Sequence, residues 1–564
     1  MEQESNQIGK KVLWQGAALL GGAALLSKLI GTMQKIPLQN LAGDEVFGLY
    51  SAVYALSVMW LTLASAGIPV AVSVLVAERI ANGDESGAQR VVRWSLGLLC
   101  WSGLLMFVIL WVGAEWFANL LGLESAAPAI RMSSLALLVA PATAVLRGYR
   151  QGGMQMQPPA LSQLIEQTAR VAFMLIAIFW AIQEAWSPSA TAAAVHGGLA
   201  VGAIAGLITM LCYTGRKRNK PFLIRAAGTR KTFGAATSPI RLVKLPESRR
   251  SLLKRIITVA FPIAIASIVA PLLGLIDAFS IPRLLQQDDM DTALSLSQFG
   301  IYNRGVALLQ LVIMGAAGAA AVLVPALTAA RARGDEAAFT SRARFAMRLA
   351  WWIGGAAAVG LALLASPINI ALFANGSGTA AMAIIALAAA GGTLQAVSAA
   401  LLQGMGDLRS PAVNLAAAAL LKLTLNAVLV PAYGIVGAAA AMAAAFAAAA
   451  VLNALSLRQR VQLPAPRLAI AWRSAAALAA MAAAVALLAL GLGALTAALP
   501  ERLQALLVAL PGVMVGAIVF AAALVALGAI APQEWRELPG LSGSRIERWL
   551  TRLHSAAHRN HKVS

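Results

Sequence analysis

Apolar runs of about twenty residues recur along the whole chain, and they constrain the fold more than any other feature. The run from Ala438 to Leu455, for example, contains no charged residue. A helix needs about 20 residues to cross a bilayer, whereas a membrane β-strand shows about ten residues of alternating polarity. The mean hydropathy is +0.76 and charged residues make up 12% of the 564 positions, against about 25% in soluble chains. The sequence therefore predicts an all-α, polytopic membrane protein.

We expect about 14 transmembrane helices. Their predicted bounds are 13–36, 48–70, 94–117, 128–147, 160–183, 190–213, 256–281, 299–328, 345–365, 379–402, 411–431, 434–457, 469–496 and 504–530. With the N-terminus inside, most basic residues fall on inner loops, and the outer segments keep only Lys35, Arg283 and Arg502. Both termini are therefore predicted to be cytoplasmic. The formal net charge of +21 reflects this orientation and not a nucleic-acid partner.

Short motifs return at a nearly constant offset, which predicts an internal repeat. Three matches lie 252 positions apart and a fourth lies 251 apart: Phe47–Tyr50 with Phe299–Tyr302, Gln151–Gly152 with Gln403–Gly404, Pro159 with Pro411, and Gly83–Glu85 with Gly334–Glu336. Each repeat holds six predicted spans, and an even number makes the repeats parallel. Transporters built from such halves bind substrate between them and work by alternating access.

This organisation divides the chain into five predicted parts. They are an N-lobe of helices 1–6 (1–215), a basic cytoplasmic loop (216–255), a C-lobe of helices 7–12 (256–458), two further C-terminal helices (459–530) and a basic cytoplasmic tail (531–564). The segment 215–255 carries 13 basic residues against one acid, Glu247, and is read as an orientation signal beside anionic lipid.

Two inner loops combine glycine with proline and are predicted hinges. The candidate hinge residues are Gly152, Gly153 and Pro159 in the first repeat, and Gly404, Gly406 and Pro411 in the second. Glycine relieves backbone strain in such turns, and proline is tolerated in the first turn of the next helix.

Ionisable residues inside the spans are the candidate functional residues, because each is costly in hydrocarbon unless it faces a partner or a wet cavity. They are Lys28, Arg131, Glu166, Arg170, Asp277, Arg304 and Lys422. Five of the seven are basic, so the interior suits an anion better than a drug cation or Na⁺. We predict that Lys28, Arg170, Arg304 and Lys422 line the cavity. Arg131 is close enough to the outer interface to snorkel.

The two acids, Glu166 and Asp277, are predicted to act in gating or coupling. Glu166 lies four residues before Arg170, so the two could equally form a structural ion pair. Asp277 and Arg304 lie toward the outer side of consecutive spans and could form an outer gate. Arg304 could instead bind a substrate phosphate through its forked donors.

No catalytic motif appears in the sequence. There is no P-loop, no HExxH and no His/Cys cluster in a span, so we predict neither an enzyme, a metal site nor a cofactor. His554, His558 and His561 are read as part of a solvated tail. Transport would then draw on an ion gradient or the membrane potential.

Two segments resemble the SpoVB/YtgP-type polysaccharide biosynthesis proteins of the MOP (multidrug/oligosaccharidyl-lipid/polysaccharide) flippase superfamily. Leu146 to Arg170, LRGYRQGGMQMQPPALSQLIEQTAR, is similar to that family's RGYxQG…PTAxSQxIEQ segment, with Pro159 where the family often has threonine. Pro271–Phe279 and Gly300–Gly305 are similar to its junction of spans seven and eight. Related MurJ-type lipid II flippases carry cavity cations on spans one, two and eight. Lys28 and Arg304 match the first and the last, and span two has no basic match.

The resemblance implies a flippase that moves undecaprenyl-pyrophosphate-linked glycan precursors, such as lipid II or a spore-cortex precursor, to the outer leaflet of a bacterial cytoplasmic membrane. Its expected partners are the lipid-linked oligosaccharide, the bilayer and cell-wall or sporulation machinery, and we expect a monomer. Two alternatives remain open: a cation-coupled multidrug exporter of the same superfamily, and a non-transport membrane scaffold for wall synthesis.

Overall fold

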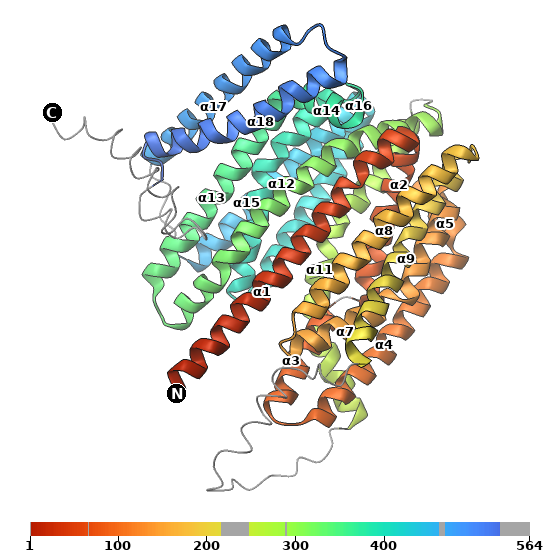
Figure 1. Ribbon diagram of the computed structural model, residues 1–564, viewed down its shortest axis with the longest axis vertical. Helices are drawn as coiled ribbons and strands as arrows, with labels where there is room; N and C mark the ends of the chain where they lie inside the picture. The colour runs from red at the N-terminus through yellow and green to blue at the C-terminus, as the bar shows by residue number, and fades with distance from the viewer. Residues whose placement is uncertain (1, 66, 216–247, 288–289, 462–467, 531–564) are drawn as a thin grey trace, which may run out of the picture. The chain divides into compact units, whose positions relative to one another are not determined.

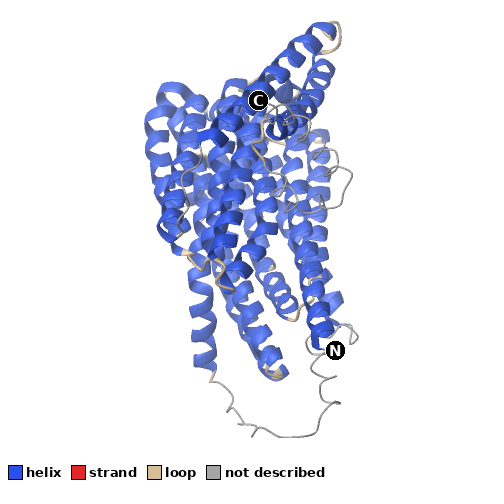
Figure 2. Ribbon diagram, turned by 90° about the vertical axis from the view of Figure 1, so that its left-hand side faces the viewer, coloured by secondary structure: helices blue, strands red, loops and turns tan. Residues whose placement is uncertain are grey.

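Helices make up every regular element of the described residues in the computed structural model (Figures 1 and 2), which describes the chain except for residues 1, 66, 216–247, 288–289, 462–467 and 531–564. The predicted basic loop and tail, with His554, His558 and His561, therefore lie mostly or wholly outside the described residues. Twelve helical segments are long and apolar enough to cross a membrane. The prediction of an all-α polytopic membrane protein is confirmed.

The helices follow one another with short connections. Their bounds are α1 (Glu2–Met33), α2 (Lys35–Ser65), α3 (Ile68–Ala81), α4 (Glu85–Val112), α5 (Ala114–Leu121), α6 (Ala127–Ser134), α7 (Ala140–Gly152), α8 (Gln157–Gln183), α9 (Pro188–Gly215), α11 (Arg249–Gln286), α12 (Thr292–Ala332), α13 (Glu336–Leu363), α14 (Ala365–Phe373), α15 (Thr379–Gly404), α16 (Arg409–Arg460), α17 (Leu468–Leu495) and α18 (Glu501–Ala526). Two 3₁₀ turns, Glu124–Ala126 and Leu135–Leu138, flank α6.

Two of the twelve segments are much longer than one bilayer crossing. Leu19–Ala81 has 63 residues and Arg409–Arg460 has 52. Each contains a glycine with positive φ, Gly43 at φ 83° and Gly434 at φ 56°, which breaks the helical path. Both glycines lie where the sequence analysis divides two spans, and the count of fourteen stays a prediction.

The chain forms two compact units, Met1–Gly300 and Ile301–Ser564. The helix expected to open the C-lobe lies within α11, and α11 packs against α2 and α3 in the first unit. Consequently the first unit extends through α11 and the first turns of α12, beyond the end expected for the N-lobe.

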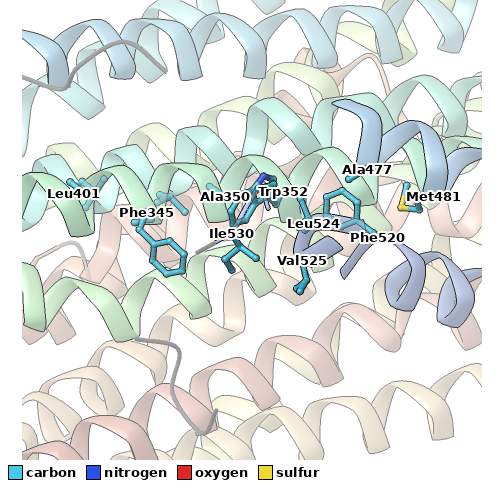
Figure 3. Close-up of a cluster of buried hydrophobic side chains, with 14 of the residues drawn as sticks. Phe345, Ala350, Trp352, Leu401, Ala477, Met481, Phe520, Leu524, Val525 and Ile530 are labelled. Atoms are coloured by element: carbon cyan, nitrogen blue, oxygen red, sulfur yellow. The ribbon is translucent and has the colours of Figure 1, made fainter. Parts of the chain in front are cut away.

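In the second unit, the core joins the two C-terminal helices to the preceding helices (Figure 3). Trp352 of α13 and Met481 of α17 are buried in one apolar cluster with Phe520 of α18. Trp352 Nε1 also donates a hydrogen bond to Ser474 Oγ at 2.9 Å, which satisfies the indole in the core. The predicted spans 13 and 14 are therefore integral to this unit's core.

Corresponding helix starts in the two predicted repeats have the same cap. Gly83 and Gly334 adopt positive φ, and the aspartates that follow them accept hydrogen bonds from the first turns of α4 and α13. Asp84 Oδ1 accepts from Gly87 N at 2.7 Å, and Asp335 Oδ1 accepts from Ala338 N at 3.0 Å. These caps satisfy amide groups that a helix start leaves unpaired.

Inside the first unit, α2 and the first turns of α12 touch at two glycines of the repeated motif. A Cβ on Gly48 would lie 1.9 Å from the backbone oxygen of Leu296, and a Cβ on Gly300 would lie 2.1 Å from that of Asp44. The two contacts are reciprocal, because Gly48 with Gly300 and Asp44 with Leu296 are both 252 positions apart. A two-fold relation between the repeats would produce this reciprocity, and the repeat itself stays a prediction.

Candidate functional site

The junction of α1 and α2 places two polar side chains inside the first unit. α1 ends at Met33 and α2 begins at Lys35, so Gln34 and Lys35 lie at the junction. Both are buried, with 3% and 6% of their surface exposed. Pro37 follows in the first turn of α2, where a missing backbone N–H costs nothing. The sequence analysis placed Lys35 in an outer segment, and that placement stays a prediction.

Tyr50 of α2 is the centre of the polar contacts in this region. Its hydroxyl accepts a hydrogen bond from Gln34 Nε2 at 3.0 Å and another from Arg170 Nη2 at 3.1 Å. The Arg170 guanidinium also lies over the ring of Tyr54, 4.9 Å from its centroid. Lys35 is within electrostatic range of Arg170. Two cations thus lie near each other, and a tyrosine hydroxyl and a tyrosine ring contact the Arg170 guanidinium.

His196 of α9 completes the group. Its side chain is fully buried and its ring stacks on Tyr50, with centroids 4.8 Å apart. Neither ring nitrogen has a hydrogen-bond partner among the described residues, although the backbone of Tyr50 lies close to the ring. We call Gln34, Lys35, Tyr50, Arg170 and His196 the polar cluster. The helices that carry it, α2, α8 and α9, pack on one another within the first unit (Figure 1).

Glu166 does not neutralise Arg170, contrary to one of the two roles considered from sequence. Arg147 of α7 donates from Nη2 to Glu166 Oε2 at 2.6 Å and to Ser162 Oγ at 2.8 Å. The i, i+4 spacing that favours a Glu166–Arg170 pair is overridden because α7 brings a guanidinium to the carboxylate. The positive charge of Arg170 is therefore not paired with Glu166, and its guanidinium contacts the polar cluster.

Arg304 lies in the second unit and is fully buried there. Its Nη1 donates to Asn369 Oδ1 at 3.2 Å and to Asn375 Oδ1 at 2.8 Å, and its guanidinium lies 5.3 Å from the Phe373 ring centroid. These contacts tie α12 to α14 and to the turn that follows it. The predicted Arg304–Asp277 gate would join the two units, and it stays a prediction.

Lys422 is also fully buried in the second unit, on α16. Its ammonium donates to Met442 Sδ at 3.3 Å. Asn426 lies one turn further on and is buried as well. Lys422 is 252 positions from Arg170, so the predicted repeat places a cation at the same point of each half.

The remaining predicted site residues are more dispersed. Lys28 is exposed on α1, whereas Asp277 is buried on α11. Arg131 pairs with Glu115 at 2.8 Å. Across the described segments, no three His, Cys, Asp or Glu side chains lie close enough to hold a metal ion.

The candidate hinge residues mark real breaks between helices. α7 ends at Gly152, with Gly153 as its cap, and α8 begins at Gln157 with Pro159 in its first turn. α15 ends at Gly404, Gly406 adopts φ 84°, and α16 begins at Arg409 with Pro411 in its first turn. Their action as hinges stays a prediction.

An arginine secures each of these two turns. Arg150 donates to Gln155 Oε1 and, at 2.7 Å, to the Tyr213 carbonyl. Arg460 pairs with Asp407 at 2.8 Å. Burial favours protonation of Asp407, but hydrogen bonds from Ser410 and the charge of Arg460 outweigh it and hold the pKa of that carboxyl below its usual range.

Sequence analysis missed four members of the polar cluster, Gln34, Lys35, Tyr50 and His196. Tyr50 belongs to the repeated motif, and the repetition could have drawn attention to it. A tyrosine in an apolar run is, however, more often a residue of the hydrophobic core. His196 is the sole histidine within a span, and Lys35 appeared to be a flanking charge. Recognising them requires the helix break and the packing of α2 on α9.

These features define a class of protein: a polytopic transporter-like bundle with buried cations. The structure resembles an inward-facing MATE family multidrug transporter of the MOP superfamily, with a TM-score of 0.62 and 16% identity over 77% of this chain and 94% of that one. It also resembles the lipid II flippase MurJ in an inward closed conformation, with a TM-score of 0.61 and 12% identity over 90% and 97% of the two chains. Likenesses at this level establish the fold.

The chain belongs to the polysaccharide biosynthesis protein family, whose model matches residues 13–330. It is 31% identical over 549 residues to the membrane protein YabM of Bacillus subtilis, covering 96% of this chain and 97% of YabM. It is 25% identical over 435 residues to the lipid II flippase MurJ of the same organism, covering 74% and 77%. The predicted family is confirmed.

Proposed function

We propose that this protein flips a polyprenyl-pyrophosphate-linked glycan precursor, lipid II or a similar unit, from the inner to the outer leaflet of the cytoplasmic membrane by alternating access. The observation that carries the proposal is the charge of the polar cluster. Arg170 is held by Tyr50 and Tyr54, while the neighbouring carboxylate of Glu166 is occupied by Arg147. Such a cluster suits the phosphates of an anionic head group.

The physical need for such a site comes from the substrate. A pyrophosphate–sugar head group cannot enter hydrocarbon unaided, because desolvating its charges is very costly. The polyprenyl tail can stay in lipid throughout. A buried guanidinium offers planar, paired donors that match phosphate oxygens, and a nearby ammonium adds a point charge. Arg170 and Lys35 would together lower the barrier to crossing.

The other predicted cations take different places in the proposal. Lys28, exposed on α1, would meet the head group on its way to the cluster. Lys422 would provide the second repeat's equivalent of Arg170. The contacts of Arg304 with Asn369 and Asn375 favour a structural role for that residue over phosphate binding.

Sequence relatives support a transport function, since MurJ of Bacillus subtilis is named a lipid II flippase. We propose cytoplasmic termini, no catalytic activity and a monomeric protein that works beside the machinery of wall or spore synthesis. In the scaffold alternative, the loop 216–255 would recruit that machinery. Deleting part of Arg216–Arg250 tests the scaffold alternative, because a scaffold would fail without the loop and a flippase would still transport.

The decisive experiment uses cells depleted of their own lipid II flippase and supplied with this chain. Lipid II accessible to a reagent that acts only outside the cell is then quantified. We expect restoration by the wild type and by Arg131→Gln, a control outside the cluster, but not by Arg170→Gln at equal membrane abundance. Failure of the wild type would exclude lipid II as the cargo, and restoration by Arg170→Gln would exclude the assigned site. Drug–proton antiport in vesicles would instead support the multidrug exporter.

A further inference from the structure

Three polar residues of α7 and α8 are bonded to one another next to the polar cluster. Arg147 donates from Nε and Nη2 to Ser162 Oγ at 3.2 and 2.8 Å, and from Nη2 to Glu166 Oε2 at 2.6 Å. Ser162 is fully buried, and its hydroxyl donates to the Gly206 carbonyl of α9 at 2.8 Å. These bonds join three helices of the first unit and fix the position of the Glu166 carboxylate.

Arg147 and Arg170 lie on opposite sides of a choice that this carboxylate has to make. Glu166 precedes Arg170 by four residues, and an acid four residues before a base is the favourable order for an ion pair within a helix. Gly202 of α9 contacts both residues, since a Cβ on it would lie 3.5 Å from Glu166 Cγ and 3.0 Å from Arg170 Cβ. Glycine puts no side chain between them. Without Arg147, the spacing would therefore pair Glu166 with Arg170.

The pairing of Glu166 decides how much positive charge the polar cluster offers. In the structure, Arg170 donates to the Tyr50 hydroxyl and lies over the Tyr54 ring, and neither contact cancels the charge of the guanidinium. A carboxylate would do so, and it would also occupy the forked donors that a phosphate needs, because carboxylate and phosphate bind the same edge of a guanidinium.

We propose that Arg147 is a positioning residue for head-group binding: it holds Glu166 away from Arg170 and thereby leaves the Arg170 guanidinium available to phosphate. This inference rests on the proposed function, because it takes Arg170 as a phosphate contact. Arg147 acts through Glu166 and needs no contact with the head group. Loss of Arg147 is therefore harmful only while Glu166 keeps its charge, and removing both charges restores binding.

Two simpler roles for Arg147 predict other results. If the Arg147–Glu166 pair only held the helices together, a variant that lacks both charges would be as defective as one that lacks the arginine. If Arg147 itself bound phosphate, the double variant would again stay defective, because the phosphate contact would still be missing. Rescue by a second substitution at Glu166 therefore distinguishes the positioning role from both.

The test is equilibrium binding of polyprenyl pyrophosphate to the purified full-length protein in lipid nanodiscs. We expect Arg147→Gln to weaken binding at least about tenfold, the loss that accompanies one charged hydrogen bond. The double variant Arg147→Gln/Glu166→Gln should bind within about threefold of the wild type, because the two substitutions are coupled through one carboxylate. Arg147→Lys keeps a cation for Glu166 and should also bind well.

The matched control is Arg131→Gln, which removes another arginine–glutamate pair of the first unit, that with Glu115. It should leave the affinity unchanged. Melting temperatures separate positioning from folding: the single and double variants at Arg147 both lack the ion pair, so they should melt alike although their affinities differ. Arg147→Met keeps the apolar stem of the side chain and should repeat the loss of affinity, so the test does not depend on one variant that folds poorly.

Each outcome has a distinct meaning. Wild-type affinity in both Arg147→Gln and Arg147→Met would overturn the positioning role and leave the flippase proposal standing. A double variant as weak as Arg147→Gln would also overturn it, because the charge of Glu166 would then not be the cause of the loss. No binding of the probe to the wild type would instead overturn the proposed function itself.

Discussion

Each unit has an arginine inside its helices, but the surroundings differ, since Arg304 is fully buried and Arg170 is half-buried. In the second unit, Asn369 of α14 and Asn375 in the turn after it accept from Arg304, and Asn369 in turn donates to the Ser377 carbonyl. In the first unit, helices supply the partners of Arg170, and these are one tyrosine hydroxyl and one aromatic ring. Neighbours of Arg170 also have unsatisfied polar atoms. We infer that amide-lined arginine stabilises the fold, whereas tyrosine-lined arginine binds a ligand.

Removing the cluster's charges should give the largest effect. Arg170→Gln and Lys35→Gln should each weaken binding of a polyprenyl-pyrophosphate head group by about ten- to a hundredfold, as expected for a charged hydrogen bond worth about 1.5–3 kcal/mol. A double-mutant cycle by titration in nanodiscs should show coupling, because in the proposed site both side chains contact the same head group. Additive losses would mean that the two cations bind independently.

Arg304→Gln should have the opposite signature. It leaves the amide oxygen of buried Asn369 without this donor, and also removes the bond to exposed Asn375, so we expect a loss of about 1–3 kcal/mol in stability, seen as a lower melting temperature. Head-group affinity should stay within about twofold of the wild type. A large loss of head-group affinity with an unchanged melting temperature would assign Arg304 to head-group binding. The two arginines would then have the same role.

The glycine contact within the first unit predicts a matched pair of effects. Gly48→Ala and Gly300→Ala should each destabilise by about 1–3 kcal/mol, because the new methyl group meets rigid backbone and the helices must separate. The two losses should be similar, since the contacts are reciprocal. Gly97→Ala on α4 is the control: no atom lies within 4 Å of its Cβ, so the helix gains up to about 1 kcal/mol. Unequal losses would argue against a two-fold relation.

The smallest effect concerns the turn between α15 and α16. The pKa of Asp407 is below its usual range, so its carboxylate stabilises the folded state fully above the unfolded-state pKa of about 3.9. That contribution is lost as the pH falls through the lower folded-state pKa. The wild type should therefore melt above Asp407→Asn from pH 7 to about 4.5, and the gap should close at lower pH. A gap that persists at pH 3 would contradict this origin.

Much of the fold can be predicted from sequence because bilayer crossing imposes a length and a polarity on every span. For this reason the break at Gly43 falls between two predicted spans, and the break at Gly434 falls at the first residue of one. The sequence says less about which helices pack together. α11 belongs to the first unit through its contacts with α2 and α3, and no periodicity in the sequence predicts these contacts.

The site shows the same limit. Charge alone identified Arg170, whose burial in hydrocarbon demands a partner. Its actual partners are tyrosines from α2, and the expected partner, Glu166, is taken by Arg147 of α7. Lys35 is recognised as a site residue only from its place at the junction of α1 and α2, and His196 only from its stacking on Tyr50. Both features depend on tertiary packing.

The most direct test of the central claim is flipping by the purified protein in liposomes. A fluorescent polyprenyl-pyrophosphate sugar is followed by its accessibility to an impermeant quencher. The account predicts rapid flipping by the wild type and by Arg131→Gln, and a rate at least about tenfold lower for Arg170→Gln at equal reconstitution. Undiminished flipping by Arg170→Gln would show that the buried cation cluster is not where the head group crosses.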